Sequence, residues 1–170
     1  MTTPLLTASD VREHRPTAEF SPCRTYRYVL RRTWSAGPAV GFILLNPSTA
    51  DETENDPTIR RCIGYAKAWG YGSLVLGNLF ALRSTDPKGL RQVADPVGPD
   101  NDDWLLRIAK EAGGKVICGW GNHGALNGRG RAVAVNLAAA GVRPLALTVT
   151  TDGSPGHPLY LRGGLKPLEL

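Results

Sequence analysis

The chain lacks the sequence features of several large classes of protein. No run of apolar residues approaches the roughly 20 that a membrane-spanning helix needs. The first residues carry neither a basic leader nor a long apolar stretch, so we expect a cytoplasmic protein with no membrane partner. The three cysteines, Cys23, Cys62 and Cys118, form no Cys-x-x-Cys pair. This spacing argues against a disulfide framework, a structural zinc site and an iron–sulfur cluster.

Motifs of common enzyme classes are also missing. The stretch Gly153-Ser154-Pro155-Gly156 does not have the Gly-x-Ser-x-Gly spacing of a hydrolase elbow. The glycine-rich stretch 119–130 contains no P-loop motif, which argues against a site for nucleoside triphosphates. No His-Glu-x-x-His or other dense set of ligands occurs, so we expect neither a metal nor a cofactor.

What remains is typical of one globular domain. The 170 residues are 42% hydrophobic and 21% charged, which is ordinary for a folded domain. The net charge of +5 permits a phosphate-bearing partner but is too mild to require one. Residues 1–24 are polar and interrupted by proline, so we expect an irregular arm followed by a single α/β domain at 25–170, and a monomer.

Apolar patterns predict alternating strands and helices. Period-two alternation over Thr25–Trp34 indicates a half-exposed strand near a sheet edge. Helix signals begin at Asp56-Pro57 and stop at Gly70, and further helices are expected at 100–112 and 129–140. Buried strands are expected at 39–45, 73–76, 116–119 and 144–149, and a long loop at 81–99. This order favours an α/β sandwich around a mainly parallel sheet, in which ligands bind beyond the carboxyl ends of the strands.

Four of those strand ends carry polar groups. Asn46-Pro47-Ser48-Thr49 follows the first buried strand, and Asn78 follows the second. The third is followed by the stretch 119–123 and the last by 152–158, which includes His157. Each stretch alone is also typical of a turn. Two asparagines and one histidine meeting at one sheet edge form a more specific pattern.

These stretches resemble, in order, four motifs of the uracil-DNA glycosylase superfamily. Leu44-Leu45-Asn46-Pro47 is similar to the motif that presents the catalytic water, and the stretch 74–83 resembles the strand whose terminal Asn reads the uracil edge. The stretch 117–123 resembles that superfamily's strand and Trp-Gly turn. His157-Pro158-Leu159-Tyr160-Leu161 resembles the His-Pro loop that stabilises the leaving base and inserts a leucine into the duplex.

The resemblance implies a fold and a reaction. The fold would be a three-layer sandwich with a central, mainly parallel four-stranded sheet, plus the N-terminal edge strand. The reaction would be hydrolysis of the N-glycosidic bond of uracil or a modified base flipped from DNA, as in base-excision repair. Asn46 would position the water, His157 would donate a hydrogen bond to the departing base, and Asn78 would pair with its imide edge.

Further residues receive roles from the same resemblance. The base would also contact Pro47 and an aromatic platform, for which Tyr65, Trp69 and Phe80 are candidates. The stack left by the flipped base would be filled by Leu161 together with Tyr160. The candidates for contact with the DNA backbone are Ser48, Thr49, Gly153, Ser154, Gly156, Pro158, Arg83 and Arg129. The chain departs from the superfamily in having Leu159-Tyr160 after the His-Pro pair and no phenylalanine at the expected distance after Asn46-Pro47.

A closer resemblance covers nearly the whole chain but implies no activity. The run 46–51 (NPSTAD), with Asn55-Asp56-Pro57-Thr58, looks like a family of small uncharacterised bacterial and phage proteins. Two other functions therefore remain open. One is hydrolysis of a free nucleoside or nucleotide in the same pocket, and the other is a non-catalytic module that recognises a modified base in DNA.

Overall fold

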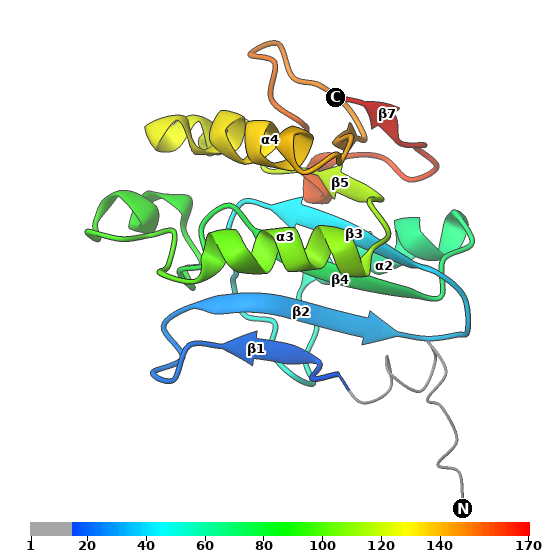
Figure 1. Ribbon diagram of the computed structural model, residues 1–170, viewed down its shortest axis with the longest axis horizontal. Coiled ribbons are helices and arrows are strands. Elements are labelled where there is room, and N and C mark those ends of the chain that lie inside the picture. The colour runs from blue at the N-terminus through cyan, green and yellow to red at the C-terminus, as the bar shows by residue number, and fades with distance from the viewer. Residues whose placement is uncertain (1–14) are drawn as a thin grey trace, which may run out of the picture.

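A computed structural model describes residues 15–170 and contains one mixed β-sheet flanked by helices (Figure 1). The sheet has seven strands in the order β1-β2-β4-β3-β5-β6-β7. Their bounds are β1 Ala18–Phe20, β2 Arg27–Thr33, β3 Ala39–Leu44, β4 Ser73–Asn78, β5 Val116–Cys118, β6 Leu145–Ala146 and β7 Leu168–Glu169. The α/β class predicted from the sequence is confirmed.

Parallel and antiparallel pairs share this sheet. β3 pairs in parallel with β4 and β5, and β5 pairs in parallel with β6. β1–β2, β2–β4 and β6–β7 are antiparallel. The strand expected near an edge corresponds to β2, which instead lies between β1 and β4. That expectation was wrong because the edge position belongs to β1, which is only three residues long and lies in the stretch 1–24 that was expected to be irregular. Residues 1–14 of that stretch are outside the described residues.

Three α-helices form where the helix signals predicted them: α2 Pro57–Ala68, α3 Asn101–Glu111 and α4 Arg129–Ala139. The Asp56 carboxylate caps α2 by accepting a hydrogen bond from the Ile59 amide, at 2.9 Å, and Pro57 occupies the first turn. Short 3₁₀ helices also form at η1 Pro87–Arg91, η2 Asn122–Gly128 and η3 Pro158–Tyr160. η1 interrupts the segment expected to be one long loop.

The helices cover both faces of the sheet. α3 and α4 pack on one face, where Leu105, Ile108 and Val133 join a buried cluster with Ile43 and Val75. α2 packs on the other face, where its buried residues join Phe42, Leu44, Leu74 and Leu76. The central strands β3, β4 and β5 contribute alternate residues to the two clusters, as the two-residue period of a strand requires. Within residues 15–170, no helix combines the length and the apolar character needed to cross a membrane.

Candidate functional site

The carboxyl ends of β3, β4 and β5 lie together at one edge of the sheet. Leu44 of β3 is in register with Asn78 of β4, so Asn46 and Asn78 emerge from neighbouring strands. Backbone hydrogen bonds continue past the strand ends. The Leu79 amide donates to the Leu44 carbonyl, and the Gly119 amide to the Ile43 carbonyl, both at 2.9 Å. The residues that follow these strands are therefore held in place by their neighbours.

The Asn46 side chain is fixed through its nitrogen. Nδ2 donates to the carbonyls of Pro47, at 3.0 Å, and Ser84, at 2.8 Å. The Ser84 amide in turn donates to the Pro47 carbonyl, which joins the turns after β3 and β4. Asn46 is half-buried, and its Oδ1 accepts no hydrogen bond from the described residues. This orientation leaves a carbonyl oxygen that can accept a hydrogen bond from a water molecule.

Asn78 is buried with an unused donor. Only 2% of the residue is exposed, and its Nδ2 has no hydrogen-bond partner among the described residues. Its backbone carbonyl accepts from Asn101 Nδ2 at 2.9 Å, and the same Nδ2 also donates to the Leu79 carbonyl at 3.0 Å. Leaving a buried polar group unpaired costs about 1–3 kcal/mol. A side chain held in this state at a strand end is a candidate for binding a ligand.

The loop that carries His157 packs against the end of β5. The Gly121 amide donates to the Pro155 carbonyl at 2.8 Å. A Cβ at Gly119 would lie 2.9 Å from Pro158 Cδ and 3.0 Å from Leu44 Cδ2, so only glycine permits this approach without rearrangement. A Cβ at Gly121 would lie 3.6 Å from the Cβ of His157. The structure therefore brings His157 to the edge that also carries Asn46 and Asn78.

Two features of its surroundings favour the neutral form of the His157 ring. Its Nδ1 accepts a hydrogen bond from the Leu159 amide at 3.3 Å, which leaves the ring proton on Nε2. Burial lowers the pKa of His157 below its ordinary value, and the Asp56 carboxylate opposes this shift without cancelling it. A neutral imidazole with a proton on Nε2 is a hydrogen-bond donor that carries no charge.

Asp56 is a site residue for which the sequence pattern predicts only a capping role. It is 7% exposed, and its carboxylate acts electrostatically on both His157 and Arg27. The Asp-Pro-Thr signal predicted the helix start but gave no sign that the cap would face the His157 loop. The proximity depends on how α2 packs against that loop, which spacing along the chain does not reveal.

Side chains of α2 and of its C-cap residue, Trp69, hold the segment that follows His157. Arg61 donates to the carbonyls of Pro158 and Leu161, the Tyr65 hydroxyl donates to the Arg162 carbonyl, and Trp69 Nε1 donates to the Leu165 carbonyl at 2.9 Å. Residues 61, 65 and 69 recur every four positions and so lie on one face of the helix. Tyr65 and Trp69, both expected as stacking candidates, stack on each other with ring centroids 5.5 Å apart. Tyr65 is therefore an anchor for this segment and is not available as a platform for a base.

Four further predictions change in the structure. Phe80 is fully buried in the cluster under α3 and α4, so it cannot stack on a base at the surface. Arg129 is also buried, donates to the Leu79 carbonyl and pairs with Asp102, so its guanidinium is not free for phosphate. Leu161 packs half-buried against the cluster beneath α2, so it does not project from the surface.

The fourth change concerns the expected phosphate-binding amides. The amides of Gly153 and Gly156 donate within their own loop, to the carbonyls of Thr150 and Thr148, both at 2.9 Å. Neither amide is therefore free for a phosphate. Ser154 is half-buried and its amide donates to the Thr150 hydroxyl, while Pro158 is buried.

Two residues of the His157 loop do project. Tyr160 is 82% exposed and Leu159 is 38% exposed, and the Tyr160 ring lies 5.7 Å from the His157 ring, centroid to centroid. Ser48 is half-buried and Thr49 is exposed in the turn after β3. These side chains remain candidates for contact with a nucleic acid.

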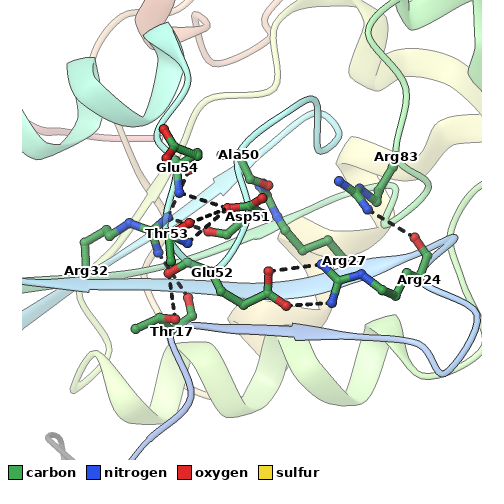
Figure 2. A network of polar contacts seen from close by, with 10 residues as sticks. All are labelled: Thr17, Arg24, Arg27, Arg32, Ala50, Asp51, Glu52, Thr53, Glu54 and Arg83. Atoms are coloured by element: carbon green, nitrogen blue, oxygen red, sulfur yellow. Dashed lines mark hydrogen bonds and ion pairs between the residues drawn. The ribbon is translucent and has the colours of Figure 1, made fainter.

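Arginines from β2 and from the loop that precedes it fix the turn that follows Thr49 (Figure 2). Arg24 pairs with Glu52 at 2.6 Å, and Arg27 Nη1 donates to the Ala50 carbonyl at 2.8 Å. Arg32 donates to the carbonyls of Asp51 and Glu54. The acidic turn is thus part of a structural network. Arg83 lies half-buried at its border, 4.9 Å from the ring of Phe20.

Arg27 is unusual among these arginines. It is 2% exposed, its Nε has no hydrogen-bond partner among the described residues, and burial lowers its pKa to about 10. Within the described part of the chain, no group of three or more His, Cys, Asp or Glu side chains is placed to hold a metal ion.

Comparison with known proteins identifies a family. The sequence model of the family described as "Protein of unknown function (DUF1643)" matches residues 27–159. No curated protein and no solved structure matches the chain. The matched range includes Asn46, Asn78 and His157.

Proposed function

We propose a function for this chain, which belongs to the DUF1643 family, from the chemistry of its own strand-end residues. It hydrolyses the N-glycosidic bond of uracil or a modified base that is flipped out of DNA. The observation that carries the proposal is the buried Nδ2 of Asn78, which has no partner among residues 15–170 and lies on the strand next to the one that presents Asn46. The neutral His157 lies on the loop packed against the end of the third strand.

The finer fold assignment belongs to the same proposal. We propose that β4, β3, β5 and β6, with helices on both faces, correspond to the parallel core of a uracil-DNA glycosylase-like sandwich. The parallel pairings of β3 with β4 and β5, and of β5 with β6, support this assignment. So does the position of the candidate residues at the carboxyl ends of those strands.

Cleavage of a glycosidic bond creates two charges that the site must accommodate. The sugar develops oxocarbenium character, and the departing base develops negative charge. The free Oδ1 of Asn46 accepts a hydrogen bond from a water and directs it toward the anomeric carbon. A neutral amide is not a strong base, but a nearly formed cation requires only a weak nucleophile. The water oxygen bonds to the anomeric carbon as the N-glycosidic bond breaks, and the proton that the water then loses neutralises the departing base anion. Fixing the Asn46 nitrogen on two carbonyls supplies the orientation in advance.

His157 and Asn78 act on the base. The Nε2–H of His157 donates to the base oxygen on which negative charge develops, and the partial burial that lowers the pKa of His157 favours this neutral donor. Asn78 Nδ2 donates to a base carbonyl, while Asn78 Oδ1 accepts from the imide N–H. A base edge with the opposite order of donor and acceptor, as in cytosine, leaves the buried amide unpaired.

The projecting part of the His157 loop suits the flipping step. Because Leu161 is packed, we assign the filling of the vacated stack to Tyr160 and Leu159. Ser48, Thr49 and Arg83 lie near the turns that follow β3 and β4 and are assigned to nearby phosphates.

The test is base release from labelled oligonucleotides. Uracil and a panel of modified bases are placed in single- and double-stranded DNA and exposed to wild type, Asn78→Ala, His157→Ala and the exposed-site control Asn136→Ala. We expect abasic product from wild type and control, and a decrease of about 100- to 1,000-fold for His157→Ala. Equal activity in all four proteins refutes the assigned site.

Other outcomes point to the alternatives. Release from free nucleosides or nucleotides but not from DNA refutes the DNA substrate and favours a small-molecule hydrolase. Binding of a modified oligonucleotide without any release refutes catalysis and favours a non-catalytic recognition module. A salt series separates these cases, because affinity for DNA falls steeply with salt.

A further inference from the structure

A second candidate site lies beside α2, in a groove separate from the turns that follow β3 and β4. We call it the α2 groove; it is lined by Arg60, Arg61, Gly64, Tyr65, Gly163 and Gly164 and has a volume of about 320 Å³. Its far wall is the segment 161–165, which Arg61, Tyr65 and Trp69 hold against α2. Because three side chains spaced along the helix fix this wall, the groove is a formed feature of the fold.

The groove carries positive charge without a counter-charge. Arg60 and Arg61 line it, and Arg162 is exposed next to Gly163. No aspartate or glutamate lines the groove, and none of these three arginines forms an ion pair with a described residue. Among the described residues, Arg60 Nη1 donates to the Asn55 carbonyl, and Arg61 donates to the carbonyls of Pro158 and Leu161 and lies 5.9 Å from the centroid of the Tyr65 ring. None of these partners carries a negative charge.

Other arginines of the protein show what the absence of a carboxylate means here. Arg24, Arg31, Arg129 and Arg143 each pair with an acidic side chain. The fold therefore neutralises several arginines elsewhere and leaves those at the α2 groove available for an anion from outside.

The glycine pair at the far wall adds backbone donors. Gly163 and Gly164 are exposed, and a Cβ on either residue would meet nothing within 4 Å. Their amides donate no hydrogen bond to the described residues. Gly164 has a φ of +80°, which favours glycine. Free amides beside guanidinium groups form a surface that phosphate oxygens can approach closely.

The position of the groove indicates which phosphate it receives. Arg61 joins the groove to the His157 loop through the carbonyls of Pro158 and Leu161, and the exposed Tyr160 lies between those two residues in sequence. The α2 groove and the loop that carries His157 and Tyr160 are therefore directly joined, so that one nucleic-acid strand can contact both.

We propose that the α2 groove binds the phosphodiester backbone of the nucleic-acid strand that flanks the flipped nucleotide. This assignment rests on the proposed function, because it takes the base site as the point where the strand enters. Arg60 and Arg162 supply the charge, the Gly163 and Gly164 amides supply directional donors, and Arg61 holds the groove and the His157 loop together.

The test measures binding of labelled oligonucleotides by fluorescence anisotropy between about 50 and 200 mM salt. The groove variant is the double substitution Arg60→Ala/Arg162→Ala. The matched control is Arg107→Ala/Arg131→Ala, which removes two exposed arginines from α3 and α4 on the opposite face. We expect the groove variant to bind more weakly than the control. Its slope of log affinity against log salt should also fall, by roughly 0.7–0.9 for each phosphate that the variant no longer neutralises.

Each outcome bears on the proposal. An equal decrease in affinity in the two double variants shows that only net charge matters and overturns the groove. The groove also fails, while the proposed function stands, if wild type releases a base from DNA and the groove variant binds and releases equally well. No oligonucleotide binding by wild type overturns both proposals. A last outcome is that oligonucleotides do not bind, whereas wild type binds a free deoxynucleoside monophosphate tightly and the groove variant does not. This result assigns the groove to a small-molecule phosphate and overturns the proposal.

Discussion

The clearest test of how the fold supports the site is removal of the Asn101 side chain. Asn101 is fully buried at the start of α3, and its Nδ2 donates to the carbonyls of Asn78 and Leu79. Asn101 therefore positions the end of β4 from the face of the sheet that α3 covers, which is opposite to the face that α2 covers. Asn101→Ala removes both hydrogen bonds and leaves the helix otherwise suited to alanine.

The expected decrease in stability follows from three contributions. Two hydrogen bonds are removed, at about 1 kcal/mol each. The Leu79 carbonyl keeps a donor in Arg129 Nε, at 2.9 Å, whereas the Asn78 carbonyl is deprived of its Asn101 donor in a buried environment. Removing Asn101 Oδ1, which is itself buried and finds no partner in the described part of the chain, offsets part of this cost. We expect a net decrease in the free energy of unfolding of about 1–3 kcal/mol.

Urea denaturation followed by tryptophan fluorescence measures this change. The midpoint should fall while the slope stays constant, because the unfolded surface is unchanged. The exposed asparagine of α4 provides a matched control, since Asn136→Ala should change stability by no more than about 0.5 kcal/mol. A decrease below about 0.5 kcal/mol for Asn101→Ala refutes the argument that Asn101 holds the end of β4.

Three further predictions follow from separate features. Because burial keeps the pKa of His157 below its ordinary value of 6.5, its stabilising contribution is full above about pH 6.5 and disappears as pH falls toward the lowered pKa. Between about pH 8 and 5, the melting temperature of wild type should fall, and that of His157→Gln should fall less. Identical pH profiles of the two proteins contradict this prediction. Gly124→Ala should destabilise by about 1–3 kcal/mol because a Cβ would lie 2.1 Å from the Trp120 ring. By contrast, Gly64→Ala, at an open position in the middle of α2, should stabilise the protein by about 0.5–1 kcal/mol. Calorimetry checks the two variants together, because the melting temperature should fall for Gly124→Ala and rise for Gly64→Ala. Finally, Cys23 is exposed, and hydrogen bonds with neighbouring side chains lower its pKa to about 7. Cys23 should therefore react with iodoacetamide in the native state before the two buried cysteines do. Equal labelling of the three cysteines by mass spectrometry contradicts this order.

The elements that the sequence predicts well are those with a strong local signal. β3 is a continuous apolar run, β4 contains the apolar run Leu74-Val75-Leu76, and α2 begins at an Asp-Pro cap that the structure uses. β1 and β7 are three and two residues long, so they exist through pairing with a neighbour rather than through their own pattern. For the same reason the strand expected at 144–149 shortens to β6, where only Leu145 and Ala146 pair.

The candidate site divides in a similar way. Asn46, Asn78 and His157 could be singled out because each follows an apolar strand, and that position does not depend on the rest of the fold. Phe80 and Arg129 were misplaced because spacing along the chain does not say which face of the sheet a residue meets once its strand has ended. The α2 groove was missed because its two walls are about 100 residues apart in sequence.

The central position of β4 has a consequence for synthesis of the chain on the ribosome. Leu76 of β4 is in register with Leu30 of β2 on one side and with Phe42 of β3 on the other. Both earlier strands therefore emerge before the strand that joins them exists. Until residues 73–78 have been synthesised, β2 and β3 have apolar surfaces and unpaired backbone groups but no common neighbour. The nascent protein thus depends on β4 to begin its core, and that interval is when the growing chain is most exposed to non-native pairing.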